Sequence, residues 1–193
     1  MQPKIGAVYL AAGNSVRFGS NKLLYPIQGK PMFTHGLSLL STIVLEGVLD
    51  DLVIVTQYPE IQKYAIEQKI LSVFNPDSRK GISSSISLGL SQLSASMDAC
   101  MFLVADQPYV SKGSVIRMIK EWKSGTKGIV CLSWKGTMGN PVLFSSHYYP
   151  ELFSLTGDVG GKKIVKKHME DVHFCEAKEE RELNDVDTIR VVQ

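Results

Sequence analysis

The stretch IGAVYLAAGNSVRFGSNKLL, residues 5–24, is the most informative part of the chain about its fold. Its first six residues form a short, β-prone apolar run, which is typical of a strand buried on both faces of a parallel sheet. The run is too short for a membrane span, and the glycine-rich loop that follows favours a buried strand over a signal peptide. We therefore expect a first strand at residues 5–10 with a loop at its carboxyl end.

Outward from this strand, short apolar runs alternate with helical patterns. Further strands are predicted at residues 51–56, 71–74, 99–105 and 128–134, and helices begin at Pro31, Pro59, Ile82 and Ser111. After residue 134 the pattern predicts a turn, a strand able to pair antiparallel, two short helices and a late strand. The alternation predicts an α/β fold, a Rossmann-like three-layer αβα sandwich with a mostly parallel sheet and an antiparallel segment. No linker or repeat interrupts the chain, so we expect a single domain over residues 1–193.

The composition is that of an ordinary globular chain and disfavours several function classes. Of the 193 residues 44% are hydrophobic and 21% charged, and the net charge is +2. A charge this small argues against long nucleic acid or an anionic membrane as partner, and no apolar run approaches the ~20 residues of a membrane helix. Cys100, Cys131 and Cys175 are far apart without a CxxC pair, so we expect buried thiols in a reducing, cytoplasmic setting.

The loop after the first strand has the features of a phosphate-binding segment. Gly13 and Gly19 allow the backbone to approach a ligand closely, and Arg17 and Lys22 add two positive charges. The Walker A pattern and the GxGxxG pattern are both absent, which disfavours a P-loop enzyme and a dinucleotide-binding oxidoreductase. An ordinary solvated loop remains the alternative on the local sequence.

The fourth predicted strand ends at Asp106, in the tripeptide Asp106–Pro108. Ligands of open α/β sheets bind outside the carboxyl ends of the strands, so Asp106 and the first loop are expected at the same edge. A carboxylate there can hold Mg²⁺, which usually takes one or two protein carboxylates together with substrate phosphates. A turn or helix-capping aspartate is the alternative.

Three further segments carry weaker signals. Residues 75–90 form a loop that runs into a helix N-terminus, which can bind an anion or simply carry serine N-caps. Residues 157–163 pair an acidic turn with a basic helix start, and such turns are most often solvated surface. Asp185 and Asp187, taken alone, indicate a helix cap, and the four histidines have no metal-ligand spacing.

Six motifs occur in order along nearly the whole chain, and together they are far more specific than any single one. They are LAAGNSVRFGSNKLL at residues 10–24, the GxxxSIxxGL pattern at 81–90, DQP at 106–108, GNPVLF at 139–144, GDxG at 157–160 and DVDT at 185–188. This series resembles the MobA-like nucleotidyltransferase family, and within it most the molybdenum cofactor cytidylyltransferases. The resemblance implies the nucleotide-diphospho-sugar transferase type of αβα fold.

The resemblance also implies an activity and a set of site residues. The implied reaction transfers CMP from CTP to the terminal phosphate of molybdopterin and releases pyrophosphate. The nucleotide would contact Leu10, Ala11, Ala12, Gly13, Arg17, Lys22, Gly81, Ser85 and Asp106. The catalytic residues would be Arg17, Lys22 and Asp106, and the acceptor would contact Asn140, Gly157 and Asp158. Asp106 would bind Mg²⁺ together with Asp185 or Asp187, and the sequence leaves that choice open.

Two features bear on the substrates that the resemblance implies. The family's GHPVLF reads GNPVLF here, so Asn140 replaces a histidine, and the acceptor could differ or bind more weakly. The related guanylyltransferases tend to have LAGG where this chain has LAAG, and the added methyl group could exclude a purine base.

A client molybdenum hydroxylase of the xanthine dehydrogenase type is an expected partner. The alternatives are transfer to a sugar phosphate or small alcohol phosphate, and a non-catalytic module that binds and delivers the cofactor.

Overall fold

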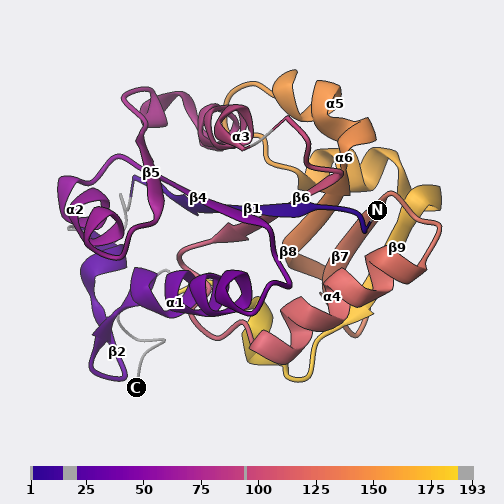
Figure 1. Ribbon diagram of the computed structural model, residues 1–193, viewed down its shortest axis with the longest axis horizontal. Coiled ribbons are helices and arrows are strands. Elements are labelled where there is room, and N and C mark those ends of the chain that lie inside the picture. The colour runs from indigo at the N-terminus through magenta and orange to yellow at the C-terminus, as the bar shows by residue number, and fades with distance from the viewer. Residues whose placement is uncertain (1, 15–20, 94, 187–193) are drawn as a thin grey trace.

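The computed structural model describes residues 2–14, 21–93 and 95–186, which contain a seven-stranded sheet (Figure 1). The strand order is β5-β4-β1-β6-β8-β7-β9. The strands are β1 (Ile5–Ala11), β4 (Asp51–Thr56), β5 (Leu71–Phe74), β6 (Ala99–Val104), β7 (Ile129–Trp134), β8 (Thr137–Ser145) and β9 (Val172–Glu176). Strand β8 pairs antiparallel with β6 and β7, and the other neighbouring strands pair parallel. The predicted sheet, including its antiparallel segment, is confirmed.

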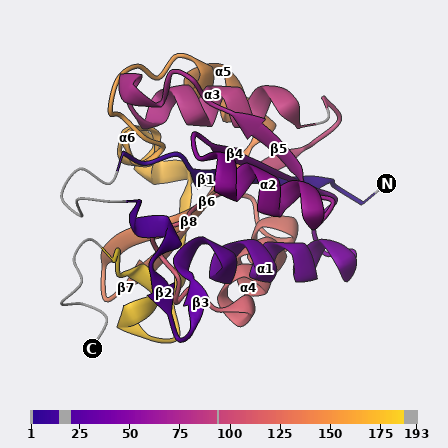
Figure 2. The same ribbon diagram turned by 90° about the vertical axis from the view of Figure 1, so that its left-hand side faces the viewer.

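Helices cover both faces of this sheet, which gives the three layers expected from the sequence (Figures 1 and 2). One face packs against α1 (Met32–Leu45), α2 (Pro59–Glu67) and α4 (Lys112–Ser124). The other face packs against α3 (Ile82–Gln92), α5 (Tyr149–Phe153) and α6 (Lys162–Lys167). The described chain also has short 3₁₀ helices: η2 (Lys22–Leu24), η3 (Ser78–Lys80), η4 (Ser146–Tyr148), η5 (Met169–Asp171) and η6 (Glu180–Leu183).

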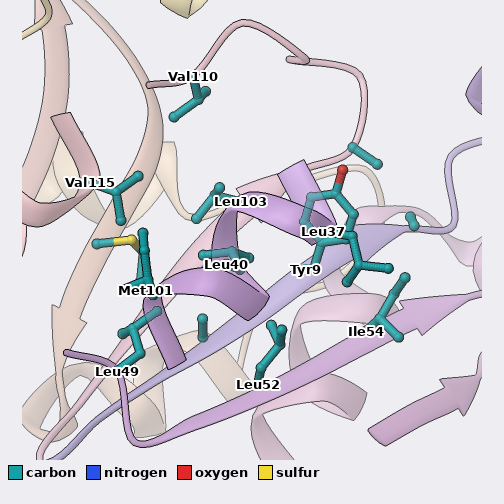
Figure 3. Packing of buried hydrophobic residues seen from close by; sticks show 14 of the residues in the cluster. Tyr9, Leu37, Leu40, Leu49, Leu52, Ile54, Met101, Leu103, Val110 and Val115 are labelled. Atoms are coloured by element: carbon teal, nitrogen blue, oxygen red, sulfur yellow. The ribbon is translucent and has the colours of Figure 1, made fainter. Parts of the chain in front are cut away.

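Strand β1 shows why the sheet needs both helical layers. Successive side chains of a strand point to opposite faces, and here Ala7 and Tyr9 join the core under α1, whereas Val8 and Leu10 join the core under α3. Figure 3 shows Tyr9 beside Leu37 and Ile54, with its hydroxyl group at the upper edge of the ring. Full burial of one large apolar side chain stabilises the fold by about 1.5–3 kcal/mol. A run that is apolar at every position therefore fits only a strand covered on both faces.

One local detail differs from the sequence-based expectation. Pro31 was expected to open a helix, but it is paired with Pro26 in a small hairpin formed by β2 (Pro26–Ile27) and β3 (Lys30–Pro31), and α1 begins at Met32. Pro31 can occupy the extended position before the helix because its ring fixes φ near a value that suits both the end of a strand and the start of a helix.

The three cysteine thiols are free and buried, as predicted. Within the described ranges, no helix is long and apolar enough to cross a membrane.

Candidate active site

The carboxyl ends of β1, β4, β5 and β6 lie at one edge of the sheet because these neighbouring strands run parallel. In Figure 2 this edge is on the side opposite the N-terminus. Polar side chains tie the loops at this edge together. The Thr56 hydroxyl donates to the Ala11 carbonyl at 2.9 Å, and the Gln57 amide donates to the Ala12 carbonyl at 2.8 Å. The Tyr58 hydroxyl donates to the Gly13 carbonyl. The first loop is therefore anchored through its backbone carbonyl groups.

The start of the predicted phosphate loop presents backbone rather than side chains. Leu10, Ala11 and Ala12 are buried, whereas Gly13 is exposed, and a Cβ atom added at Gly13 would meet no atom within 4 Å. Any contact of this segment with a nucleotide would therefore come mainly from its main-chain groups. Arg17 and Gly19 lie outside the described residues.

Lys22 and Asp106 form an ion pair, with the Lys22 ammonium 2.8 Å from the Asp106 Oδ2 atom. Their side chains are 11% and 26% exposed, so Lys22 is largely buried while the carboxylate remains open to solvent on one side. Burial and, next, the charge of Asp106 raise the pKa of the neighbouring Tyr9 hydroxyl well above its usual value. The structure thus brings together the cation and the carboxylate that the sequence placed 84 positions apart.

The C-terminal segment, which carries Asp185, is tied to the residues that follow β6. The Gln107 amide donates to Asp185 Oδ1 at 2.7 Å and to the Leu183 carbonyl at 3.0 Å. The Val186 N–H donates to the Asp106 carbonyl at 2.9 Å. These contacts bring the backbone of the Asp185 segment against the Asp106–Gln107 segment. Asp187 lies outside the described residues.

Gly81, at the start of α3, has a φ of +101°, a conformation that glycine adopts without strain. A Cβ atom added there would lie 2.3 Å from the Gly157 carbonyl carbon, so only glycine leaves room for this contact. The Ser83 hydroxyl also donates to the Gly157 carbonyl at 2.8 Å. The candidate acceptor segment, in which Asp158 is exposed, is therefore packed directly against the start of α3.

Ser85 was expected to contact the nucleotide, and in this structure its hydroxyl is engaged inside the protein. The residue is 4% exposed, and its Oγ atom accepts a hydrogen bond of 2.9 Å from the buried Asn75 amide. Asn75 also donates to the Ser84 hydroxyl at 3.0 Å. Ser85 therefore holds α3 to the loop after β5 in this structure.

Asn140 is half-buried on β8. A Cβ atom added to the preceding Gly139 would lie 2.5 Å from the Leu183 side chain. Leu183 in turn accepts the hydrogen bond from Gln107 described above. The residue before Asn140, Gly139, therefore packs against the segment that carries Asp185.

Sequence reasoning assigned no individual role to several polar residues that build this edge. They are Gln57, Tyr58, Asn75, Ser78 and Gln107, and the Ser78 hydroxyl donates to the Gln57 side chain at 2.8 Å. All of them follow within a few residues the end of a predicted strand. The rule that ligands bind at the carboxyl ends of strands would have found them if it had been applied to every strand.

The donors at this edge suit a hard divalent cation. Among the described residues no group of three or more histidine, cysteine, aspartate or glutamate side chains could enclose a metal. Asp106 and Asp185 provide two carboxylates, which is the usual protein contribution to a Mg²⁺ site that substrate phosphates complete. Mn²⁺ accepts the same oxygen ligands.

Comparisons with known proteins show the family of this chain. A family model described as the MobA-like NTP transferase domain matches residues 7–172. The purine catabolism protein PucB of Bacillus subtilis (strain 168) is 30% identical over 197 residues, covering 96% of this chain and 93% of PucB.

Two solved structures share the fold. Rv0371c of Mycobacterium tuberculosis H37Rv, in complex with manganese, superposes with a TM-score of 0.74 and 22% identity over 90% of this chain and 88% of its own. A nucleotidyl transferase from Methanothermobacter thermautotroptrophicus (Mth528) gives a TM-score of 0.80 with 20% identity over 98% of this chain and 96% of its own. The αβα fold of the nucleotide-diphospho-sugar transferase type is confirmed. Because the family model spans most of the chain and PucB aligns along nearly all of it, the chain belongs to the MobA-like NTP transferase family.

Proposed function

We propose that this protein transfers CMP from CTP to the terminal phosphate of molybdopterin and releases pyrophosphate. The observation that carries the proposal is the Lys22–Asp106 pair at the carboxyl edge of the sheet, next in sequence to Gln107, which binds Asp185. A purely structural ion pair would not require a tie to a second carboxylate at the edge where ligands of such sheets bind. The ordered family motifs supply the choice of CTP and molybdopterin.

The protein's contribution to this reaction is positioning and charge stabilisation. An ionised acceptor phosphate can attack the α-phosphorus of the nucleotide directly, so no strong general base is needed. Lys22, with Arg17, would contact the triphosphate and offset the charge that develops on the pyrophosphate leaving group. Backbone N–H groups near Gly13 would contribute further donors.

Asp106, with Asp185 or Asp187, would hold the metal ion. When bound, Mg²⁺ would supply Lewis-acid polarisation of the phosphates. The manganese complex of Rv0371c agrees with a divalent cation and leaves its identity to be measured.

The acceptor is proposed to lie between the Gly157–Asp158 turn and Asn140. The turn is packed on Gly81 at the start of α3, so it lies against a segment that the nucleotide is proposed to contact. The name of PucB places that relative in purine catabolism. Xanthine is a purine, so this name supports a client molybdenum hydroxylase of the xanthine dehydrogenase type. A cytoplasmic location, in which the thiols stay reduced, belongs to the same proposal.

One observation favours a second candidate function. Asn140 replaces the histidine that the family motif has at this position. A neutral amide offers different hydrogen bonds from an imidazole, and a different phosphorylated acceptor, such as a sugar phosphate or small alcohol phosphate, would fit that change. A non-catalytic delivery module is less well supported, because cofactor binding alone does not need the Lys22–Asp106 pair.

Pyrophosphate release measured with each of CTP, GTP, ATP and UTP, in the presence of Mg²⁺ and molybdenum-loaded molybdopterin, tests the proposal. We expect release with CTP alone, and its loss in the Asp106→Asn variant. Release with another nucleotide would retain the reaction class and reject the base assignment. Release only with other phosphorylated acceptors would support the second candidate, and no release with any acceptor would support the delivery module.

A further inference from the structure

Gln107 is a buried side chain that joins the two candidate metal-binding segments. It follows Asp106 directly and is only 4% exposed. Its Nε2 atom donates to Asp185 Oδ1 at 2.7 Å and to the Leu183 carbonyl at 3.0 Å. Both partners are acceptors, so the amide nitrogen must face them, and the flipped orientation would place an oxygen against two oxygens.

The other end of the same amide is unsatisfied. Gln107 Oε1 is buried and has no hydrogen-bond partner among the described residues. A buried acceptor without a partner is unfavourable, and an apolar side chain of similar volume would avoid this loss. Packing alone therefore does not account for a glutamine here, whereas the two hydrogen bonds from Nε2 do.

The main chain around Asp185 is held by other contacts. The buried Glu182 accepts hydrogen bonds from the Ser111 and Lys178 N–H groups, each at 3.0 Å. The Val186 N–H donates to the Asp106 carbonyl. These contacts place the backbone of the segment, and the Gln107 amide contacts the Asp185 carboxylate itself.

We propose that Gln107 is a positioning residue that orients the Asp185 carboxylate toward the cation held at Asp106. The inference rests on the metal-dependent function proposed above and goes beyond it by assigning a role to a residue that is itself not a ligand. A carboxylate oxygen that accepts one hydrogen bond keeps further acceptor capacity. Hydrogen-bond partners of metal-ligating side chains typically change metal affinity about 10- to 100-fold when they are removed.

The test is Mn²⁺ binding to the full-length protein, followed by electron paramagnetic resonance with and without CTP. Gln107→Met keeps the volume and removes the donor, and we expect it to raise the Kd for Mn²⁺ about 10- to 100-fold. Gln92→Met, on the exposed end of α3, is the matched control and should leave the Kd unchanged. A wild-type Kd in folded Gln107→Met, or no Mn²⁺ binding by the wild-type protein under either condition, would overturn the inference.

A further measurement separates orientation from a merely structural role. At saturating Mg²⁺ the kcat of Gln107→Met should return to within about threefold of the wild-type value, because the metal affinity and not the chemistry is impaired. If the variant does not fold, nuclear magnetic resonance of the wild-type protein replaces it. Mn²⁺ should then broaden the Gln107 side-chain amide signals, and unaffected signals would reject the proposal.

The outcomes also separate this inference from the proposed function. Mn²⁺ binding that depends on Asp106 and not on Gln107 would reject only the positioning role. Mn²⁺ binding that depends on Asp106, Asp185 and Gln107, without pyrophosphate release from any nucleotide and acceptor, would reject the function and retain the positioning role.

Discussion

Asp106 and Glu182 are two carboxylates in one corner of the molecule, and their surroundings differ in an instructive way. Glu182 is buried and accepts hydrogen bonds from the fixed backbone N–H groups of Ser111 and Lys178. Asp106 is partly exposed, and it pairs with the flexible side chain of Lys22. Burial opposes the ionised form of Glu182, but the hydrogen bonds from Ser111, Ser114 and Lys178 outweigh it and lower the pKa of this carboxyl.

The difference indicates distinct roles for the two groups. A buried carboxylate whose two oxygens are each held by a backbone donor is closed off from a ligand, and it anchors one segment to another. A carboxylate that stays open to solvent and faces a lysine can exchange its partner when phosphates and a cation arrive. We therefore assign Glu182 to stability and Asp106 to function, and the following predictions can break this assignment.

The largest expected effect is that of Asp106→Asn on catalysis. The amide cannot replace an anionic ligand for the cation, so we expect kcat to fall about 10³-fold or more. The midpoint of urea unfolding should remain close to that of the wild-type protein. Loss of the folded circular dichroism spectrum would instead make Asp106 the structural member of the pair.

Lys22→Ala should have the next largest effect. Loss of one donor that stabilises transition-state charge typically costs about 3–4 kcal/mol, or about 10²–10³ in kcat. The measurement is steady-state pyrophosphate release at saturating nucleotide. Near-normal kcat in this variant would show that the Lys22–Asp106 pair is a structural contact.

Glu182→Gln should lower stability rather than kcat. Hydrogen bonds to a buried charged group each contribute about 1.5–3 kcal/mol, so we expect the free energy of unfolding to fall by a similar amount. Glu180→Gln, an exposed change on the same 3₁₀ helix η6, is the matched control and should stay within about 0.5 kcal/mol of the wild-type protein. Equal stability of the two variants in urea titrations would contradict the anchoring role.

The smallest expected effect is the pH dependence of that stabilisation. The folded-state pKa of Glu182 is lowered from its usual value of 4.5, so its contribution is present above pH 4.5 and is lost as pH falls through the folded-state value. The difference in unfolding free energy between the wild-type protein and Glu182→Gln should therefore shrink as pH falls below about 4.5. A difference that stays constant between pH 7 and pH 3 would exclude ionisation of Glu182 as its origin.

Much of the fold could be predicted because the apolar runs have only one way to be buried. The run at residues 5–10 is apolar at every position, and such a strand must be covered on both faces, as β1 is. Asp106 and Lys22 could be named because strand ends place them at the ligand-binding edge. Pro31 was placed in a helix because proline favours both a helix start and a strand end, and local sequence does not decide between them.

Local order along the chain thus determined the strands, the helices that cover them and the segments that carry charge. The pairing of Lys22 with Asp106, the approach of Asp185 through Gln107, and the packing of Gly157 on Gly81 were decided only by the tertiary structure. Each of these contacts joins residues more than 70 positions apart. A local sequence pattern does not predict which distant residues come into contact. Their geometry depends on strand order and on helix packing, which follow from burying the whole core at once.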